Sequence, residues 1–154
     1  MLTDQERSDI LREIERSERP EAACVEALRI VQARRGWVSD GAIREIAPML
    51  GMTPEELDAV ATFYAFIFRG PVGRHTIFVC DSVSCWIMGH EALLRHLRER
   101  YGLSPGQTTR DGRFTLLPVS CLGACDGAPA VMIDRDLHVD LDPEKLDRLL
   151  DRYR

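Results

Sequence analysis

Apolar residues recur at spacings of three and four through the first seventy positions of the chain, with polar residues between them. Such spacing places one apolar face along a helix, because an α-helix turns once in about 3.6 residues. The apolar groups are Ile10, Leu11 and Ile14; Val25, Leu28 and Val31; Ile43, Ile46 and Leu50; and Leu57, Val60 and Tyr64. Residues 1–70 are therefore expected to form a small bundle of four helices.

Residues that start or end helices separate these groups. Gly36 and Gly51 follow the second and third groups, where helix C-termini are expected. Ser39 stands where it can cap the third helix. The segment Thr53-Pro54-Glu55-Glu56 supplies an N-cap, a proline at the first helical position and a reciprocating glutamate. This segment predicts a capping box at the start of the fourth helix.

The periodicity changes from helical to mixed beyond Gly70-Pro71-Val72-Gly73, so we expect a second domain over residues 71–154. Its expected elements are a strand over 75–79, a helix over 89–101, a strand over 114–119, a hairpin of strands 130–133 and 137–139, and a helix from Asp142-Pro143 to Tyr153. This order predicts a small α/β sandwich with a mixed sheet. The whole chain is therefore expected to be of the α+β class.

Four of the five cysteines form two pairs, and each pair follows a predicted strand. Four residues separate Cys80 from Cys85, three separate Cys121 from Cys125, and thirty-five lie between the pairs. Four soft thiolates suit zinc or an iron–sulfur cluster better than hard cations. The pattern predicts a four-thiolate metal site. Cys24 stands apart in a helical stretch and is expected to be a small buried hydrophobe.

These residues predict the presence of a metal site more clearly than the identity of the metal. The four-residue interval favours a [2Fe-2S] cluster, which is wider than a single ion. Ser82, Ser84, Gly123 and Gly127 are expected to leave backbone N–H groups free to donate to sulfur. A structural zinc site would use the same number of ligands. A thioredoxin-type dithiol enzyme is disfavoured, because the chain contains no Cys-x-x-Cys segment.

Other features narrow the classes of function. The 154 residues carry a formal charge of −5, which argues against nucleic acid as a partner. No Gly-rich phosphate loop or dinucleotide fingerprint is present, so NADH or a flavin is expected to bind elsewhere. The four histidines, at positions 75, 90, 96 and 138, are dispersed and are expected to be surface or packing residues. Asp81 and Asp126 adjoin cysteines and are expected to be exposed loop residues.

Two observations bear on where the protein is located. Residues 1–7 are polar and acidic and have neither the cationic start nor the apolar stretch of an export signal, so a cytoplasmic location is expected. The longest apolar run, residues 59–68, is about half of the roughly 20 residues that a membrane span needs. Any membrane association is expected to go through a partner.

Several segments together resemble one known family. They are Cys80-Asp81-Ser82-Val83-Ser84-Cys85, Cys121-Leu122-Gly123-Ala124-Cys125, Asp111-Gly112-Arg113-Phe114-Thr115-Leu116-Leu117-Pro118 and Ala61-Thr62-Phe63-Tyr64. With them the chain is similar, over nearly its whole length, to the thioredoxin-like [2Fe-2S] subunit of the NADH-dehydrogenase module of bacterial respiratory complex I. The cysteine spacing also fits related subunits of NAD-dependent hydrogenases and formate dehydrogenases.

The resemblance implies a fold, a cofactor and a partner. It implies a helical bundle (1–70) followed by a thioredoxin-like [2Fe-2S] ferredoxin domain (71–154), with Cys80, Cys85, Cys121 and Cys125 as the cluster ligands. The chain would be an electron-transfer subunit of NADH:quinone oxidoreductase, without a complete active site of its own. NADH and FMN would bind to a partner flavoprotein subunit, and the complex would hold the chain peripheral to the inner membrane.

Three alternatives stay open at this point. The first is an equivalent diaphorase subunit of an NAD-dependent hydrogenase or formate dehydrogenase. The second is a zinc-stabilised structural binding module, and the third is a thiol oxidoreductase. Metal analysis, disulfide-reductase activity and the identity of copurifying partners distinguish these alternatives.

Overall fold

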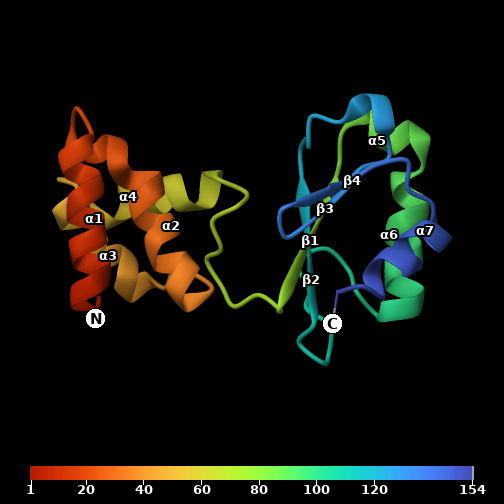
Figure 1. Ribbon diagram of the computed structural model, residues 1–154, viewed down its shortest axis with the longest axis horizontal. Helices are drawn as coiled ribbons and strands as arrows, with labels where there is room; N and C mark the ends of the chain where they lie inside the picture. Colours follow the sequence, from red (N-terminus) through yellow and green to blue (C-terminus); the bar gives the residue numbers. More distant parts are fainter. Residues whose placement is uncertain (154) are drawn as a thin grey trace. The chain divides into compact units, whose positions relative to one another are not determined.

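The computed structural model describes residues 1–153 and contains two compact units, Met1–Pro71 and Val72–Arg154 (Figure 1). The predicted second domain ends at residue 154, which lies outside the described residues. The first unit is helical, and the second combines helices with a four-stranded mixed sheet. The α+β class predicted from the periodicity is confirmed. Each unit has its own hydrophobic core.

The predicted four helices of the first unit are confirmed. They are α1 (Asp4–Arg16), α2 (Cys24–Arg35), α3 (Asp40–Met49) and α4 (Pro54–Phe63), with a 3₁₀ turn, η1 (Pro20–Ala23), before α2. Each helix contributes apolar residues to one core, including the fully buried Ile10, Leu28, Ile46 and Leu57. Cys24 packs against this core as an apolar side chain, but it is half-buried where a buried residue was expected.

Side chains and glycines set the helix ends as predicted. The Thr53–Glu56 capping box at the start of α4 is present, and the Ser39 hydroxyl accepts the N–H of Ala42 at 3.3 Å. Gly36 ends α2 with φ +82°, a left-handed conformation that favours glycine. These contacts satisfy N–H and C=O groups that helix ends would otherwise leave without partners.

One charge in the first unit is buried. Glu6, only 1 % exposed, completes a second capping box by accepting the backbone N–H of Thr3 at 2.7 Å. Arg35 of α2 donates from Nε to Oε1 of Glu6 at 2.7 Å, and from a second guanidinium nitrogen to Oε2. The hydrogen bonds from Arg35 lower the pKa of Glu6 to about 2. This forked pair joins α1 to α2.

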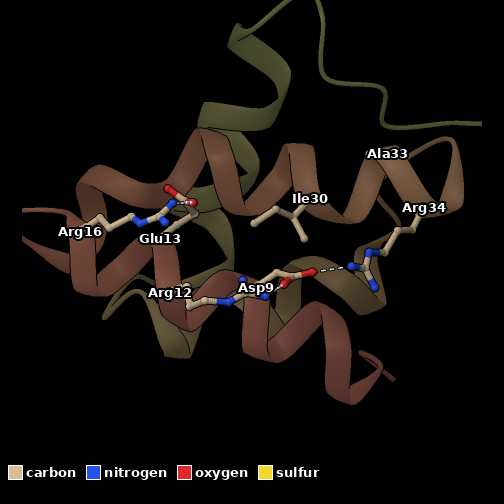
Figure 2. A pocket seen from close by; sticks show the side chains of 7 residues that line it. All are labelled: Asp9, Arg12, Glu13, Arg16, Ile30, Ala33 and Arg34. Carbon is tan, nitrogen blue, oxygen red and sulfur yellow. Dashed lines mark hydrogen bonds and ion pairs between the residues drawn. The ribbon is translucent and has the colours of Figure 1, made fainter.

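A charged groove of about 320 Å³ runs between α1 and α2. Figure 2 shows Asp9 of α1 reaching Arg34 of α2, while Arg12 also pairs with Asp9 and Arg16 pairs with Glu13. Such exposed pairs contribute little stability. Both carboxylates of the groove are already ion-paired, and the groove contains none of the predicted site residues.

The second unit is built on the sheet order β2-β1-β3-β4. Its elements are β1 (His75–Cys80), α5 (Val83–Met88), α6 (His90–Tyr101), β2 (Phe114–Val119), the 3₁₀ turn η2 (Cys125–Gly127), β3 (Val131–Ile133), β4 (Asp136–His138) and α7 (Pro143–Leu150). The pair β1–β2 is parallel, and β1–β3 and β3–β4 are antiparallel. The predicted mixed sheet is confirmed.

Helices α6 and α7 cover the same face of the sheet (Figure 1). Ile77 and Val79 of β1 share a buried cluster with Leu97 of α6 and Leu146 of α7. Alternate residues of a strand point to opposite faces, so Cys80, next to Val79, belongs to the other face. It lies in a separate small cluster of buried residues.

The structure differs from the sequence-based expectation at two places in this unit. Helix α5 is absent from that expectation, which places a loop at residues 80–85. Four of its six side chains are exposed and apolar, so the segment shows no buried helical face. Tyr153 lies beyond α7, which ends at Leu150. Within residues 1–153, no helix has both the length and the apolar character required to cross a membrane.

Candidate metal centre

The parallel pairing of β1 and β2 brings the two cysteine pairs to one end of the sheet. Cys80 ends β1 and is aligned with Val119, the last residue of β2. The chain leaves both strands at the same end of the sheet, and Cys121 follows shortly after Val119. The carbonyl of Ala130, just before β3, accepts the N–H of Cys80 at 3.2 Å, so the segment after Cys125 also returns to this end of the sheet.

The four predicted site residues differ in exposure. Cys80 and Cys85 are buried, at 2 % and 1 % exposure, in a small cluster with Ala128 and Ala130. Cys121 and Cys125 are exposed. The site therefore has one closed side, formed by the end of β1 and by α5, and one open side.

The thiols interact across the two segments. Burial raises the pKa of the Cys85 thiol, and contact with Cys80 and the charge of Cys125 raise it further. The pKa of the Cys121 thiol is lowered, first by the backbone N–H of Gly123 and then by the thiols of Cys125 and Cys80. Cys85 is therefore close to Cys80 and Cys125, and Cys121 is close to Cys125 and Cys80. The structure brings all four cysteines together.

Two glycines are expected to present backbone N–H groups to sulfur, and the structure shows this for one of them but not for the other. Gly123 does so: its N–H donates to Sγ of Cys121 at 3.3 Å, from a backbone with φ +75°. For Gly127 the expectation is wrong, because its N–H donates to the carbonyl of Ala124 at 3.2 Å. A Cβ at residue 127 would lie 2.6 Å from Cβ of Val139, so close packing requires this glycine.

The two serines act through their hydroxyl groups. Ser82 precedes α5 at the N-cap position, but its side chain makes no capping hydrogen bond. Its hydroxyl instead makes a small contribution to the lowered pKa of the Cys121 thiol. The pKa of the Cys125 thiol is raised, chiefly by the neighbouring Cys121, and the hydroxyl of Ser84 partly offsets this rise. The two serine hydroxyls of the first cysteine segment therefore lie close enough to the sulfurs of the second to influence their pKa values.

The donor set fits an iron–sulfur cluster by its chemistry. Four soft thiols meet at the end of a rigid sheet, and N–H and O–H donors accompany the exposed pair. Among residues 1–153, no group of three or more His, Cys, Asp or Glu side chains is already arranged to hold a metal ion. The same four thiols are the ligand type that [2Fe-2S] clusters use.

Three of the four histidines pair outside this site. His75 lies 2.8 Å from Asp134, His96 lies 2.8 Å from Asp147, and His138 lies 3.1 Å from the Tyr153 hydroxyl. These positions agree with the expectation of surface or packing roles.

The fourth histidine is at the site, and the sequence reasoning missed it. His90 is buried, and its Nδ1 lies 3.0 Å from the carbonyl oxygen of Cys80. Its Nε2 lies 3.7 Å from the carboxylate of Asp81. Asp81 and Asp126 are exposed, as expected. The available signal was the position of His90 at the first turn of the helix that follows the first cysteine pair.

A mixed sheet with four soft thiols grouped beyond the ends of β1 and β2 is an arrangement suited to a small iron–sulfur protein. The family described as thioredoxin-like [2Fe-2S] ferredoxin matches residues 10–154. The chain belongs to this family. The resemblance and the fold class stated from the sequence are confirmed, as is the [2Fe-2S] cluster as the cofactor of the family.

Curated relatives match the chain over almost its full length. It is 54% identical to the E-type subunit of the NADH-quinone oxidoreductase of Pseudomonas aeruginosa, over 99% of this chain and 92% of the relative. It is 52% identical to the corresponding NADH-quinone oxidoreductase subunit of Escherichia coli strain K12, with the same coverage of both chains.

The chain is also similar to part of a solved structure. An NAD+-reducing [NiFe]-hydrogenase in the H2-reduced state matches with a TM-score of 0.69 and 32% identity, over 84% of this chain. The match covers 22% of the hydrogenase chain, so this chain spans about a fifth of that chain's length.

Proposed function

We propose that this chain is the electron-transfer subunit of an NADH-quinone oxidoreductase, and that Cys80, Cys85, Cys121 and Cys125 hold one [2Fe-2S] cluster. The observation that carries the proposal is that the four thiols come together at the end of the sheet where β1 and β2 both finish. The curated relatives, both named as subunits of this enzyme, support it.

The chain's residues have three roles in this function. The cluster, when bound, accepts and passes on one electron at a time. The cysteines bind it, and the strand ends and α5 fix where each sulfur lies. The N–H of Gly123 and the hydroxyls of Ser82 and Ser84 donate toward the exposed sulfurs, which stabilises the additional negative charge after reduction.

The partner in this proposal is a flavoprotein subunit that binds NADH and FMN. Helix α5 carries Cys85 and also presents Val83, Trp86, Ile87 and Met88, each at least 60 % exposed. Exposed apolar groups of this kind typically mark surfaces that bind other proteins. The patch supports docking of the partner at the cluster, and the complex would hold the chain at the cytoplasmic face of the inner membrane.

Anaerobic purification and metal analysis test the proposal. The chain should contain about two irons and two sulfides and show visible absorption that bleaches on reduction. Stoichiometric zinc without iron would support the structural zinc module, and disulfide-reductase activity without metal would support the thiol oxidoreductase.

A second candidate is the equivalent subunit of an NAD-reducing hydrogenase, which the structural similarity favours. Proteins that copurify with the untagged chain distinguish the two assemblies. Quinone-reductase subunits support the first candidate, and hydrogenase subunits support the second.

A further inference from the structure

We infer that His90 is a positioning residue for the cluster site, because its imidazole holds the carbonyl group of Cys80 and so fixes the end of β1. The inference rests on the proposed function in one respect, the assignment of Cys80 as a ligand. His90 would not touch the cluster, and it would act through the backbone of Cys80.

The contact defines the state of the imidazole ring. Nδ1 of His90 lies 3.0 Å from the carbonyl oxygen of Cys80, and both groups are buried. A carbonyl oxygen can only accept a hydrogen bond, so Nδ1 carries the proton and donates it. The carboxylate of Asp81 lies 3.7 Å from Nε2, too far for a direct hydrogen bond.

The position of the carbonyl explains why a donor is needed there. Cys80 is the last residue of β1, and its N–H donates to the carbonyl of Ala130 at 3.2 Å. The next N–H, that of Asp81, donates to Val119 at 2.8 Å, and α5 begins soon afterwards at Val83. A buried backbone carbonyl requires a partner, and the imidazole supplies it where the strand ends.

The hydrogen bond also closes a loop that contains a second ligand. Residues 80–90 leave β1, form α5 with the buried Cys85, and return at the start of α6. Gly89 has φ +125°, a backbone conformation that side chains disfavour, and it joins the two helices directly. The His90 contact therefore restrains Cys80 and Cys85 relative to each other, which are the two ligands on the closed side of the site.

Substitutions of His90 in the full-length, cluster-loaded chain test this role. His90→Leu removes the donor and keeps a similar apolar volume, whereas in His90→Asn the amide nitrogen can occupy the position of Nδ1. His96→Leu is the matched control, because His96 lies on the same helix and pairs with Asp147 outside the site. The readouts are the EPR spectrum and midpoint potential of the reduced cluster, and the rate of iron release to a chelator.

We expect His90→Leu to release iron about tenfold faster than the unmodified chain, the factor that follows from losing one buried hydrogen bond. Its EPR spectrum and midpoint potential should shift, because the Cys80 sulfur changes position. His90→Asn should restore all three readouts toward those of the unmodified chain. His96→Leu should leave the spectrum and the potential unchanged, even if it lowers the melting temperature.

Two results would overturn the inference. The first is a His90→Leu protein with an unchanged spectrum, potential and release rate. The second is a His90→Asn protein that behaves like His90→Leu. If His90→Leu does not fold, His90→Gln takes its place. The amide donor of glutamine lies one bond farther from the backbone than that of asparagine, so His90→Gln should shift the EPR spectrum and His90→Asn should not. Equal spectra for these two variants would then refute the inference. An unmodified chain without iron would instead refute the proposed function.

Discussion

Replacing Glu6 by glutamine removes a buried negative charge from the first turn of α1 and leaves the side chain's shape almost unchanged. The carboxylate accepts hydrogen bonds from Thr3 and from two nitrogens of Arg35. Hydrogen bonds to a charged group contribute more than those between neutral groups. The substitution therefore tests how strongly this pair stabilises the helical unit.

The magnitude follows from the pKa of Glu6. The hydrogen bonds from Arg35 are the largest cause that lowers this pKa, from 4.5 to about 2, and burial opposes them. At 1.36 kcal/mol for each pH unit, this difference corresponds to about 3 kcal/mol of folding free energy at neutral pH. A lowered pKa means that the contribution is present above pH 4.5 and is lost as the pH falls toward 2.

Urea unfolding of the full chain measures this contribution. Trp86→Phe in both proteins leaves Trp37, in the helical unit, as the single tryptophan, so its fluorescence reports on that unit. We expect Glu6→Gln to lower the free energy of unfolding by about 3 kcal/mol at pH 7. The difference between the two proteins should fall to less than half of this by about pH 3.

A control separates the buried pair from an ordinary surface charge. Glu13, which pairs with the exposed Arg16 on α1, should give a change of about 0–1 kcal/mol when replaced by glutamine, with little dependence on pH. The reasoning is refuted if Glu6→Gln and Glu13→Gln have equal effects at pH 7. It is also refuted if the effect of Glu6→Gln is the same at pH 7 and pH 3.

Three further predictions concern the second unit. Cys121→Ala should abolish cluster binding and increase hydrogen exchange in residues 72–153 more than in residues 1–71; equal increases in both would contradict the two-unit organisation. Ser82→Ala should lower the midpoint potential by on the order of tens of millivolts, since it removes a donor to sulfur, and an unchanged potential would show that the hydroxyl is not involved. Gly127→Ala should lower thermal stability by about 1–3 kcal/mol through the contact with Val139, whereas Gly70→Ala, with open space around it, should have little effect; similar melting temperatures for both variants would contradict the packing argument.

Much of the fold could be predicted because the signals are local. The capping box at Thr53, the cap at Ser39 and the glycine at position 36 each act within one helix end, and all three occur as expected. The strand before Cys80 could be recognised for the same reason, since a short apolar run ends directly at the cysteine. Local residue types were therefore sufficient to predict most elements and to single out the four cysteines as candidates, whose role as ligands stays a prediction.

The features that could not be predicted depend on tertiary contacts. The position of His90 in the first turn of α6 is a local signal, but its contact with Cys80 also requires α5 and α6 to fold back on the end of β1. The packing of Gly127 against Val139 joins residues on different segments and cannot be read from the glycine alone. The serine hydroxyls reach cysteines of the other segment, whereas the sequence suggested only their backbone groups.

The unequal exposure of the four cysteines determines which sulfurs a reagent from solution reaches first. Any reagent that reaches the sulfurs from solution, such as iron, sulfide, an oxidant or an alkylating agent, meets Cys121 and Cys125 before it meets Cys80 and Cys85. Cluster assembly is therefore expected to begin at the exposed pair, and oxidative damage to begin at the same two sulfurs. A partner subunit that covers this side would protect the finished cluster from both loss and oxidation.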